Sequence, residues 1–395
     1  MGKMIPLSVP NFEGNEALYV KKAVEQGWVS TAGAYIVELE KKMAEYLHMS
    51  SAVACQSGTA AIHLAMMECG IEPKDGVIVP TLTFIAAVNP VSYLHAQPIF
   101  MDCDESLCMD PAKLESFCRL ECNFESGVLY TKEGKIPIKA IVVVHVFGNL
   151  CDMEAIMEIA KEFRLKVIED ATESLGTKYS QGKYVGRYAG TIGDFGAFSY
   201  NGNKIITTGG GGMLVSNHVE LLEHARYIST QAKDDPCFYV HNEVGYNYRM
   251  TNVQAAIGVA QMEMLEEFLQ RKKNQYEYYR EKFKNSKYGF LLPFRQGTNP
   301  NYWFYSFVCN QSLSDEKMRA IVEKLAERGI QTRPVWGLIH LQKPYRYARA
   351  YRIDQAVAYG SRIINIPCST NLTIEEMDAV ILGLNQVLEE AAHED

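Results

Sequence analysis

Short β-branched runs alternate with amphipathic helical segments through the first two thirds of this chain. The strand-like runs cover 51–55, 76–80, 98–102, 140–146 and 166–170. Helical spacing of apolar residues is found between them, at 35–47, 60–69 and 153–163. Buried parallel strands are continuous apolar runs, and each needs a crossover connection to its neighbour. The alternation therefore predicts an α/β protein with a mostly parallel sheet and helices on both faces.

The pattern changes after about residue 250. Residues 253–283 form one long helical stretch without an internal proline, which begins apolar and ends charged. We expect such a helix to leave one core and bridge to a second domain. An aromatic strand-like run at 302–308 and helices at 315–328 and 373–391 follow. We therefore predict a large domain over 1–255 and, over 256–395, the linking helix with a smaller α+β domain.

Charge and cysteine spacing argue against several classes of protein. The 395 residues include 39 basic and 47 acidic side chains, a net charge of −8, without the basic block of a nucleic-acid-binding protein. No apolar run reaches the roughly 18 residues that a membrane span needs. The ten cysteines contain no C-x-x-C pair, so we expect no metal and mostly small core residues. The N-terminal residues do not resemble a signal peptide, and we expect a cytoplasmic enzyme.

Three segments at predicted strand ends carry residue types suited to catalysis, because parallel sheets bind ligands at the carboxyl ends of their strands. Gln56–Ala61 can offer helix N-terminal amides to an anion, or it is an ordinary capped turn. Asp170 can hold a positive charge, or it caps a helix. Lys204 lies in a loop between a serine and a glycine run, where burial would lower its pKa and make it a nucleophile, or it is a surface lysine.

Together these three segments have the order that pyridoxal phosphate chemistry requires. The lysine forms an imine with the cofactor, the aspartate keeps the pyridine nitrogen protonated, and the turn binds the phosphate. A fourth segment, 245–250, predicts a polar pocket wall or a subunit contact, because it combines two tyrosines, an asparagine and an arginine. An NAD-dependent Rossmann enzyme is the competing prediction, and the missing G-x-G-x-x-G turn opposes it.

Ordered motifs from about Ile5 to Leu388 resemble the DegT/StrS family of pyridoxal-phosphate sugar aminotransferases. They are GWVSTAG (27–33), SGTAAIHLA (57–65), PTLTFIAAVN (80–89), VVHVFGN (143–149), IEDATESLG (168–176), DFGAFSYNGNKIITTGGGGM (194–213), GYNYRMTNVQAAIG (245–258) and HLQKPY (340–345). The resemblance implies the aspartate-aminotransferase (type I) fold, with a mostly parallel sheet of the seven-stranded type. The chain is most similar to the LegC-like subgroup, which aminates C4 of a UDP-linked 4-keto-6-deoxy-N-acetylhexosamine.

The resemblance also implies catalytic roles for three residues. Lys204 would be the Schiff-base lysine and later the base that moves a proton between cofactor carbon and nitrogen. Asp170 would pair with the pyridine nitrogen, and Glu173 would lie near the ring hydroxyl. Histidine replaces this lysine in dehydratase relatives, so Lys204 favours transamination, with L-glutamate as the amino donor.

Further positions would bind the cofactor by the same resemblance. Phe84 would stack on the ring, while Gly58 and Thr59 would give backbone donors to the phosphate, together with the Ser199 hydroxyl. Asn247 would reach the phosphate of the neighbouring subunit's cofactor. That contact implies a homodimer with shared active sites.

Substrate selectivity is expected from polar-aromatic loops at the mouth of the site. The candidate residues are Trp28, Ser30, Thr31, Arg249, Arg333, Trp336 and His340. Arg333 is the candidate for the sugar-nucleotide diphosphate, by resemblance, because a guanidinium makes charge-assisted hydrogen bonds to phosphate. Trp336 would pack on the sugar or base, or it belongs to a structural corner.

The substrate itself stays open among several alternatives. Many family members carry a glutamate in the segment where this chain has Gly209–Gly212, which resembles the LegC-like subgroup but weakens arguments from the wider family. A C3-specific aminotransferase, an enzyme acting on a dTDP- or GDP-linked keto sugar, and a non-catalytic regulator with the same fold are the alternatives.

Overall fold

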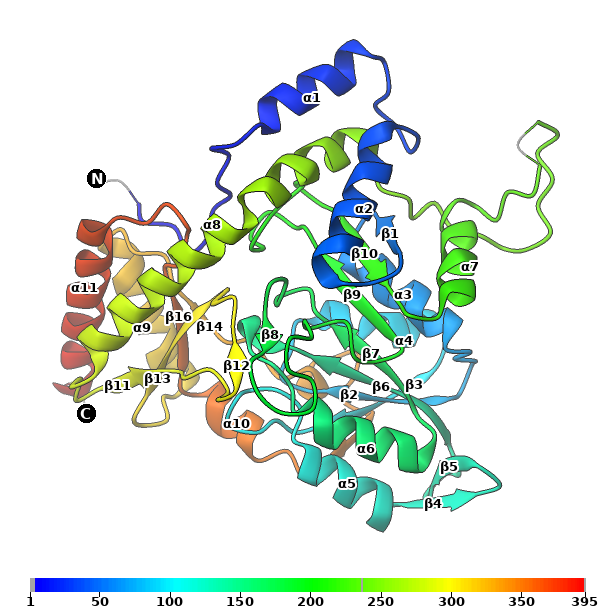
Figure 1. Ribbon diagram of the computed structural model, residues 1–395. Coiled ribbons are helices and arrows are strands. Elements are labelled where there is room, and N and C mark those ends of the chain that lie inside the picture. Colours follow the sequence, from blue (N-terminus) through cyan, green and yellow to red (C-terminus); the bar gives the residue numbers. More distant parts are fainter. Residues whose placement is uncertain (1–3, 236, 394–395) are drawn as a thin grey trace.

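A ten-stranded sheet forms the centre of the molecule in the computed structural model, which describes residues 4–235 and 237–393 (Figure 1). The strand order is β1-β10-β9-β7-β6-β2-β3-β15, with a β4–β5 hairpin attached to β6. In chain order the strands are β1 (Ala52–Cys55), β2 (Gly76–Pro80), β3 (Gln97–Met101), β4 (Cys122–Glu125), β5 (Val128–Thr131), β6 (Pro137–Val144), β7 (Lys166–Asp170), β9 (Phe195–Ser199), β10 (Gly212–Val215) and β15 (Arg349–Tyr351). Neighbours from β9 to β15 are parallel, whereas β10 is antiparallel to both β1 and β9. The predicted mostly parallel sheet is confirmed.

Alternating side chains of the central strands enter two separate cores. On β6, Ile141 and Val143 join one hydrophobic cluster, while Ala140 and Val142 join the other. This follows from the period of two along a strand. The first face is covered by α2 (Ala34–Leu47), α5 (Pro111–Leu120), α6 (Met153–Phe163) and α8 (Asn252–Phe283). The second is covered by α3 (Gly58–Glu68), α4 (Asn89–Tyr93) and α7 (Val219–Ser229). Helices therefore cover both faces, as predicted.

A smaller antiparallel sheet follows α8 in the chain (Figure 1). Its order is β11-β13-β16-β14, formed by β11 (Gly289–Leu291), β13 (Tyr305–Cys309), β16 (Ile363–Ile366) and β14 (Arg333–Pro334). The helices of this part are α9 (Asp315–Glu327), α10 (Gln355–Gly360) and α11 (Ile374–His393). Phe283, at the end of α8, packs against Phe307 of β13 with ring centroids 4.9 Å apart. The long helix thus connects the two sheets. The buried residues of the small sheet belong to the same hydrophobic cluster as one face of the large sheet.

Two segments cross the predicted division at residue 255. Ile5, near the N-terminus, pairs with Ile330 beside the small sheet. In the other direction, β15 pairs with β3 of the large sheet although it follows the small domain's first strands. The domain limits stay a prediction, and residues 1–3, 236, 394 and 395 within them lie outside the described residues.

Local sequence explains where α8 begins. Thr251 accepts a hydrogen bond from the Gln254 backbone, and the Gln254 side chain accepts one from the Thr251 backbone. This capping box satisfies backbone groups that an isolated helix end leaves without partners. The remaining elements are α1 (Glu16–Glu25), which lies along α8, the short pair β8 (Lys178–Tyr179) and β12 (Thr298–Asn299), and the 3-10 turns η1 (Ile85–Ala87), η2 (Val146–Gly148) and η3 (Ile339–Leu341).

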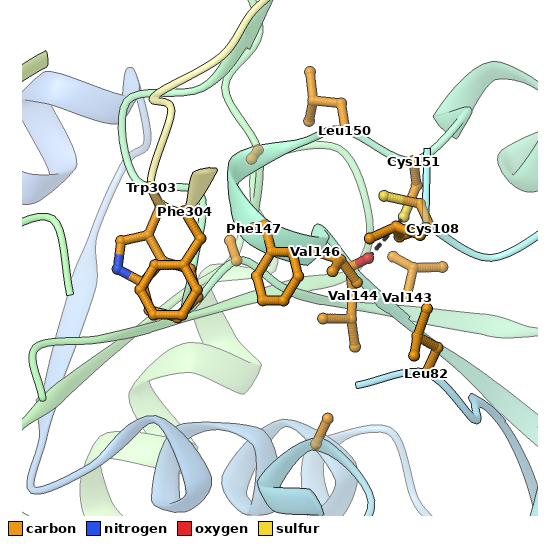
Figure 2. Packing of buried hydrophobic residues seen from close by; sticks show 14 of the residues in the cluster. Leu82, Cys108, Val143, Val144, Val146, Phe147, Leu150, Cys151, Trp303 and Phe304 are labelled. Atoms are coloured by element: carbon orange, nitrogen blue, oxygen red, sulfur yellow. Dashed lines mark hydrogen bonds between the residues drawn. The ribbon is translucent and has the colours of Figure 1, made fainter. Parts of the chain in front are cut away.

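Most cysteines are buried, as predicted: only Cys69 and Cys237 are partly or fully exposed, and all ten are free thiols. Cys108 and Cys151 lie in the core beside β6, in the view of Figure 2. Over 4–235 and 237–393, no three His, Cys, Asp or Glu side chains are grouped to hold a metal ion. Nor does any helix in that part of the chain combine the length and apolar character needed to cross a membrane.

Candidate active site

The predicted catalytic segments meet in one pocket of about 370 Å³ at an edge of the large sheet. Strands β1, β7 and β9 all run toward this edge, so the residues that follow them converge there. The pocket is lined by Gln56, Ser57, Gly58, Thr59, Ile62, Thr83, Phe84, Ala86, Ala87, Asp170, Thr172, Glu173, Ser199, Asn201, Asn203, Lys204, Gly210, Gly211, Trp303, Phe304 and Trp336.

Asp170 is the last residue of β7 and is buried. The Thr172 backbone N–H donates to its Oδ1 at 3.0 Å. Burial raises the pKa of the Asp170 carboxyl, against the opposing effects of the Thr172 hydrogen bonds and the positive charge of Lys204. The alternative of a helix cap is wrong, because the residues directly after Asp170 form turns and no helix starts there.

The turn before α3 is both a helix cap and part of the pocket wall. Ser57 Oγ accepts from the Ala60 backbone N–H at 3.0 Å, which is the ordinary capping role. Gly58 lies so close to its neighbours that a Cβ there would be 2.8 Å from Thr172 Cγ2 and 2.9 Å from Ser199 Cβ. Only glycine permits this approach of the helix N-terminus to the strand ends.

Lys204 lies in the loop after β9 with only 12% of its side chain exposed, so the alternative of a surface lysine is wrong. Its backbone N–H donates to Asn201 O at 3.0 Å, which closes a turn. Its Nζ lies 3.7 Å from Glu173 Oε1 and 4.1 Å from the ring centre of Trp303. Burial lowers the pKa of Lys204, while the carboxylates of Glu173 and Asp170 act in the opposite direction.

Glu173 connects the lysine to the backbone of η2. Its Oε2 accepts from the Phe147 backbone N–H at 2.8 Å. Burial raises the pKa of Glu173 to about 7, despite the neighbouring Lys204 charge. A carboxyl that exchanges its proton near neutrality therefore lies beside the buried amine.

The structure also differs from the sequence prediction around the lysine. Residues 195–199, for which no element was predicted, form strand β9, and the loop that carries Lys204 begins after Ser199. The predicted strand at 302–308 begins later, at Tyr305, because Asn301 Oδ1 accepts from the Trp303 backbone N–H at 2.9 Å in a local turn. This turn directs Trp303 and Phe304 into the pocket wall.

Two further buried groups support the site: Glu169, which precedes Asp170 at the predicted strand end and was given no role of its own, and Trp303, which was not predicted. Glu169 accepts hydrogen bonds from the backbone N–H groups of Gly190, Ile192 and Gly193 and pairs with the His145 ring at 2.9 Å. It therefore anchors the loop before β9 rather than facing the pocket. Trp303 was hidden in a run that looked like a strand, and its aromatic partner Phe304 was the only available signal.

The predicted substrate residues do not gather at one place: Trp28, Ser30, Thr31 and Arg333 are exposed, whereas Arg249, Trp336 and His340 are half-buried. Trp336 lines the pocket and lies 4.6 Å from the Phe147 ring. The Arg249 guanidinium forms an ion pair with Glu40, and the His340 ring bonds Thr81 Oγ1 at 2.6 Å. Neither lines the pocket, and the same holds for Trp28, Ser30, Thr31, Asn247 and Arg333. Phe84 and Ser199 do line it, and Phe84 is exposed at its mouth.

The arrangement fits pyridoxal phosphate. The Asp170 carboxylate and the Lys204 amine both line the pocket. The N-terminus of α3 also borders it, and at Gly58 it comes so close to Thr172 and Ser199 that a side chain would not fit between them. The fold and site together define a pyridoxal-phosphate-dependent transferase of the type I fold.

Known proteins share this fold and sequence. The family model of the DegT/DnrJ/EryC1/StrS aminotransferase family matches residues 10–385. The chain is 38% identical to the GDP-perosamine synthase of Caulobacter vibrioides over 386 residues, covering 97% of this chain and 98% of the relative. It is 36% identical to the GDP-perosamine synthase of Escherichia coli O157:H7, covering 97% and 98%. A DegT DnrJ EryC1 StrS aminotransferase from Brucella abortus has a TM-score of 0.84 with 26% identity, covering 94% of this chain and 95% of that one.

The chain therefore belongs to the DegT/DnrJ/EryC1/StrS aminotransferase family. It is an aminotransferase, and its cofactor is pyridoxal phosphate. The family, fold and cofactor predicted from the motifs are confirmed.

Proposed function

We propose that the protein transfers the amino group of L-glutamate to C4 of a nucleotide-linked 4-keto-6-deoxy sugar. The observation that carries this proposal is the convergence of Asp170 and Lys204 on one pocket in a chain of this aminotransferase family. A non-catalytic regulator would need neither residue. The presence of both Asp170 and Lys204 in the pocket therefore argues against that alternative.

Pyridoxal phosphate, when bound, supplies an electron-accepting ring that carries the amino group between the two substrates. The N-terminus of α3, at Gly58 and Thr59, would bind the phosphate, because helix N-terminal amides and the helix dipole favour an anion. The Ser199 hydroxyl would add a donor. Phe84 would cover one face of the ring at the pocket mouth.

Three side chains would manage charge and protons. Asp170 would hold the proton on the pyridine nitrogen, because a nearby carboxylate favours the charged form of a cation. Lys204 would carry a proton at Nζ, and its lowered pKa increases the fraction of free amine at neutral pH. Glu173 would lie near the ring hydroxyl, within reach of the same Nζ.

Two nucleotides are candidates for the sugar substrate. The relatives from Caulobacter vibrioides and Escherichia coli are named for a GDP-linked sugar, and the identity to them extends over nearly the whole chain. We therefore propose a GDP-linked keto sugar as the first candidate. The Gly209–Gly212 run supports the second, a UDP-linked 4-keto-6-deoxy-N-acetylhexosamine. Amination at C4 rather than C3 is part of the proposal for both.

A substrate panel tests this proposal. The enzyme is incubated with L-glutamate and GDP-, UDP- or dTDP-linked 4-keto and 3-keto sugars, and products are identified by mass and NMR spectroscopy. We expect a 4-amino product from the GDP-linked 4-keto sugar, and Lys204→Ala is the matched control. Amination of only 3-keto or dTDP-linked sugars would contradict the proposal. No amination of any keto sugar would remove the nucleotide-sugar assignment.

We further propose a homodimer with shared sites. Asn247 is exposed and does not line the pocket of its own chain. Asn247 pairs with Thr230 directly after α7, at the base of the segment that projects from the molecule in Figure 1 and exposes Phe238, Tyr239 and Val244. Backbone hydrogen bonds of Tyr246 and Tyr248 to Ile228 and Ser229 hold its base in place. A partner subunit that receives Asn247 beside its cofactor phosphate would account for this exposure. A cytoplasmic location stays a prediction.

Subunit mixing tests the dimer. Asn247→Asp would add a negative charge beside the partner's phosphate and weaken cofactor binding. In a heterodimer of Asn247→Asp with Lys204→Ala, one site carries both changes and the other carries neither. Partial recovery of activity is therefore expected after subunit exchange. Demonstrated exchange without recovery would place Asn247 at its own subunit's site or outside any site.

A further inference from the structure

The amine of Lys204 lies between a carboxylate and an aromatic face. Glu173 Oε1 is 3.7 Å from Nζ, which is longer than a good hydrogen bond. On another side, the indole ring centre of Trp303 is 4.1 Å away, well within the roughly 6 Å of a cation–π contact. Asp170 is the other acidic group that acts on this lysine. The indole is therefore a main contact of the buried ammonium.

The indole is held in place through its own side-chain contacts. Its Nε1–H donates to the backbone oxygen of Asn203 at 2.6 Å, so it bonds the residue next to Lys204 in the chain. Its ring stacks on Phe304 with centroids 4.0 Å apart and planes 11° from parallel. Figure 2 shows this stack beside Phe147 in the buried cluster. The orientation of the ring face toward the lysine is thus determined by packing and by one hydrogen bond.

The backbone of Trp303 is held from two further directions. Asn301 accepts from the Trp303 N–H at 2.9 Å and donates through Nδ2 to the Glu173 backbone oxygen at 2.9 Å. The buried Lys272 donates to the Trp303 backbone oxygen at 2.7 Å. Asn301 therefore links Trp303 to the same segment that carries Glu173. The Glu173 carboxylate and the Trp303 indole, which both lie beside Lys204, are thus connected through hydrogen bonds of Asn301.

We propose that Trp303 is a positioning residue that stabilises the Lys204 ammonium formed when the amine, freed from the cofactor, takes up a proton. The proposal rests on the proposed role of Lys204 in amino transfer, in which the amine is freed in each half-reaction, accepts a proton and passes it on. A buried ammonium without compensating contacts is strongly disfavoured. An aromatic face stabilises it without taking its proton, as a close carboxylate can.

The pH dependence of Lys204 acetylation tests this proposal. The full-length chain, freed of cofactor by dialysis, is treated with acetic anhydride over a range of pH, and the Lys204 peptide is quantified by mass spectrometry. We expect the midpoint to fall in Trp303→Leu, because loss of the aromatic face destabilises the ammonium. The shift should correspond to a several-fold change in the amine-to-ammonium ratio. In Trp303→Phe, which keeps an aromatic face, the midpoint should stay closer to that of the unaltered chain.

Fluorinated tryptophan tests the same contact without changing the shape of the side chain. The chain has three tryptophans, and 5-fluorotryptophan incorporated at all of them weakens the electrostatics of each ring face. We expect the Lys204 midpoint to fall in the labelled chain and to stay unchanged when Trp303→Phe is labelled. The second measurement excludes effects from Trp28 and Trp336. This arm also decides the matter if Trp303→Leu does not fold.

Phe304→Leu is the matched control, since it removes the stacked ring but leaves the indole face. It should lower the acetylation midpoint less than Trp303→Leu does, because the indole keeps its hydrogen bond to Asn203. The proposal is overturned by a midpoint in Trp303→Leu at or above that of the unaltered chain, or by an equal fall in Phe304→Leu. Fluorination without effect on the midpoint would overturn it as well.

Half-reactions separate this role from substrate binding. Because Lys204 acts with both substrates, Trp303→Leu should slow the glutamate and sugar half-reactions to the same extent. A change in the sugar half-reaction alone would make Trp303 a substrate contact instead. The acetylation midpoint is measured without any sugar. The Trp303 proposal can therefore be wrong while the substrate proposal is right, and the substrate proposal can be wrong while the Trp303 proposal is right.

Discussion

The reactive residues and the residues predicted to select the substrate differ in whether the fold of one chain brings them into the pocket. At depth, Asp170 and Glu173 are buried and accept hydrogen bonds from backbone N–H groups, and Lys204 lies beside them with 12% of its side chain exposed. The predicted substrate residues Arg333 and Trp28, by contrast, are exposed and do not line the pocket. The reactive side chains are therefore assembled within one chain, whereas these two predicted substrate residues lie outside the pocket lining.

Loss of the lysine should have the largest effect and affect both halves of the reaction. Lys204→Ala removes the one lysine among the described residues that line the pocket, so the visible absorption of the lysine-bound cofactor and steady turnover should both vanish. Absorption spectra and both half-reactions measure this. Normal multiple turnover in the variant would mean that the depth of the pocket does not carry the chemistry.

Neutralising the aspartate should be the next largest effect. Asp170→Asn removes the charge that would favour a protonated pyridine nitrogen, while the amide keeps nearly the same shape. An opposite charge shifts a neighbouring pKa by about 1–3 units, so we expect a loss of roughly ten- to a thousandfold in kcat. Cofactor should still bind, as measured by absorption after gel filtration. A rate near that of the unaltered enzyme would reduce Asp170 to a structural role.

Glu173 should make stability depend on pH near neutrality. Its folded pKa of about 7 lies above the 4.5 of an ordinary glutamate, so the folded chain binds the extra proton in between. Stability from this group is full below about pH 4.5 and is lost as pH rises toward 7. Glu173→Gln in the cofactor-free chain should therefore gain in melting temperature relative to the unaltered chain as pH rises from 5 to 8. A difference independent of pH would show that Glu173 is ionised throughout.

The substitution of Arg333 should have the smallest effect, and it should change the reaction with only one of the two substrates. Arg333→Ala should raise KM for the nucleotide sugar by about three- to tenfold and leave the glutamate half-reaction nearly intact, since only the sugar carries a diphosphate. Single-turnover measurements with each substrate separate the two. An equal loss in both half-reactions would make Arg333 a structural residue or a contact shared by both substrates.

Much of the depth of the pocket was predictable because it depends on local patterns. Strands 76–80 and 166–170 and the helix 153–163 were predicted with the observed limits, since apolar periodicity and turn residues bound them closely. Asp170 was identified because it ends a strand, and the turn at Gln56–Ala61 because its glycine precedes a helix. The predicted order of these motifs was enough to identify the cofactor.

Other features depended on contacts between distant segments. Strand β15 was not predicted, because its short run is stabilised by pairing with β3, some 250 residues earlier. Trp303 is held in the pocket wall by its indole hydrogen bond to Asn203, about 100 residues earlier, and by Lys272 on its backbone oxygen. The loops around Trp28 and Arg333 were predicted as polar-aromatic substrate loops, but no pattern in them indicated where they would lie relative to the pocket.

The sequence alone thus determined the fold class, the strand ends at which the reactive residues lie and the cofactor that they serve. These properties follow from hydrophobic periodicity and from turn chemistry, which act over a few residues. The tertiary structure decided that Lys204 is buried, that Glu173 lies beside it and that an indole faces its amine. Burial and the charges brought close by folding set the pKa of each group. Neither can be predicted from the spacing of residues in the sequence, because both depend on which distant segments come together.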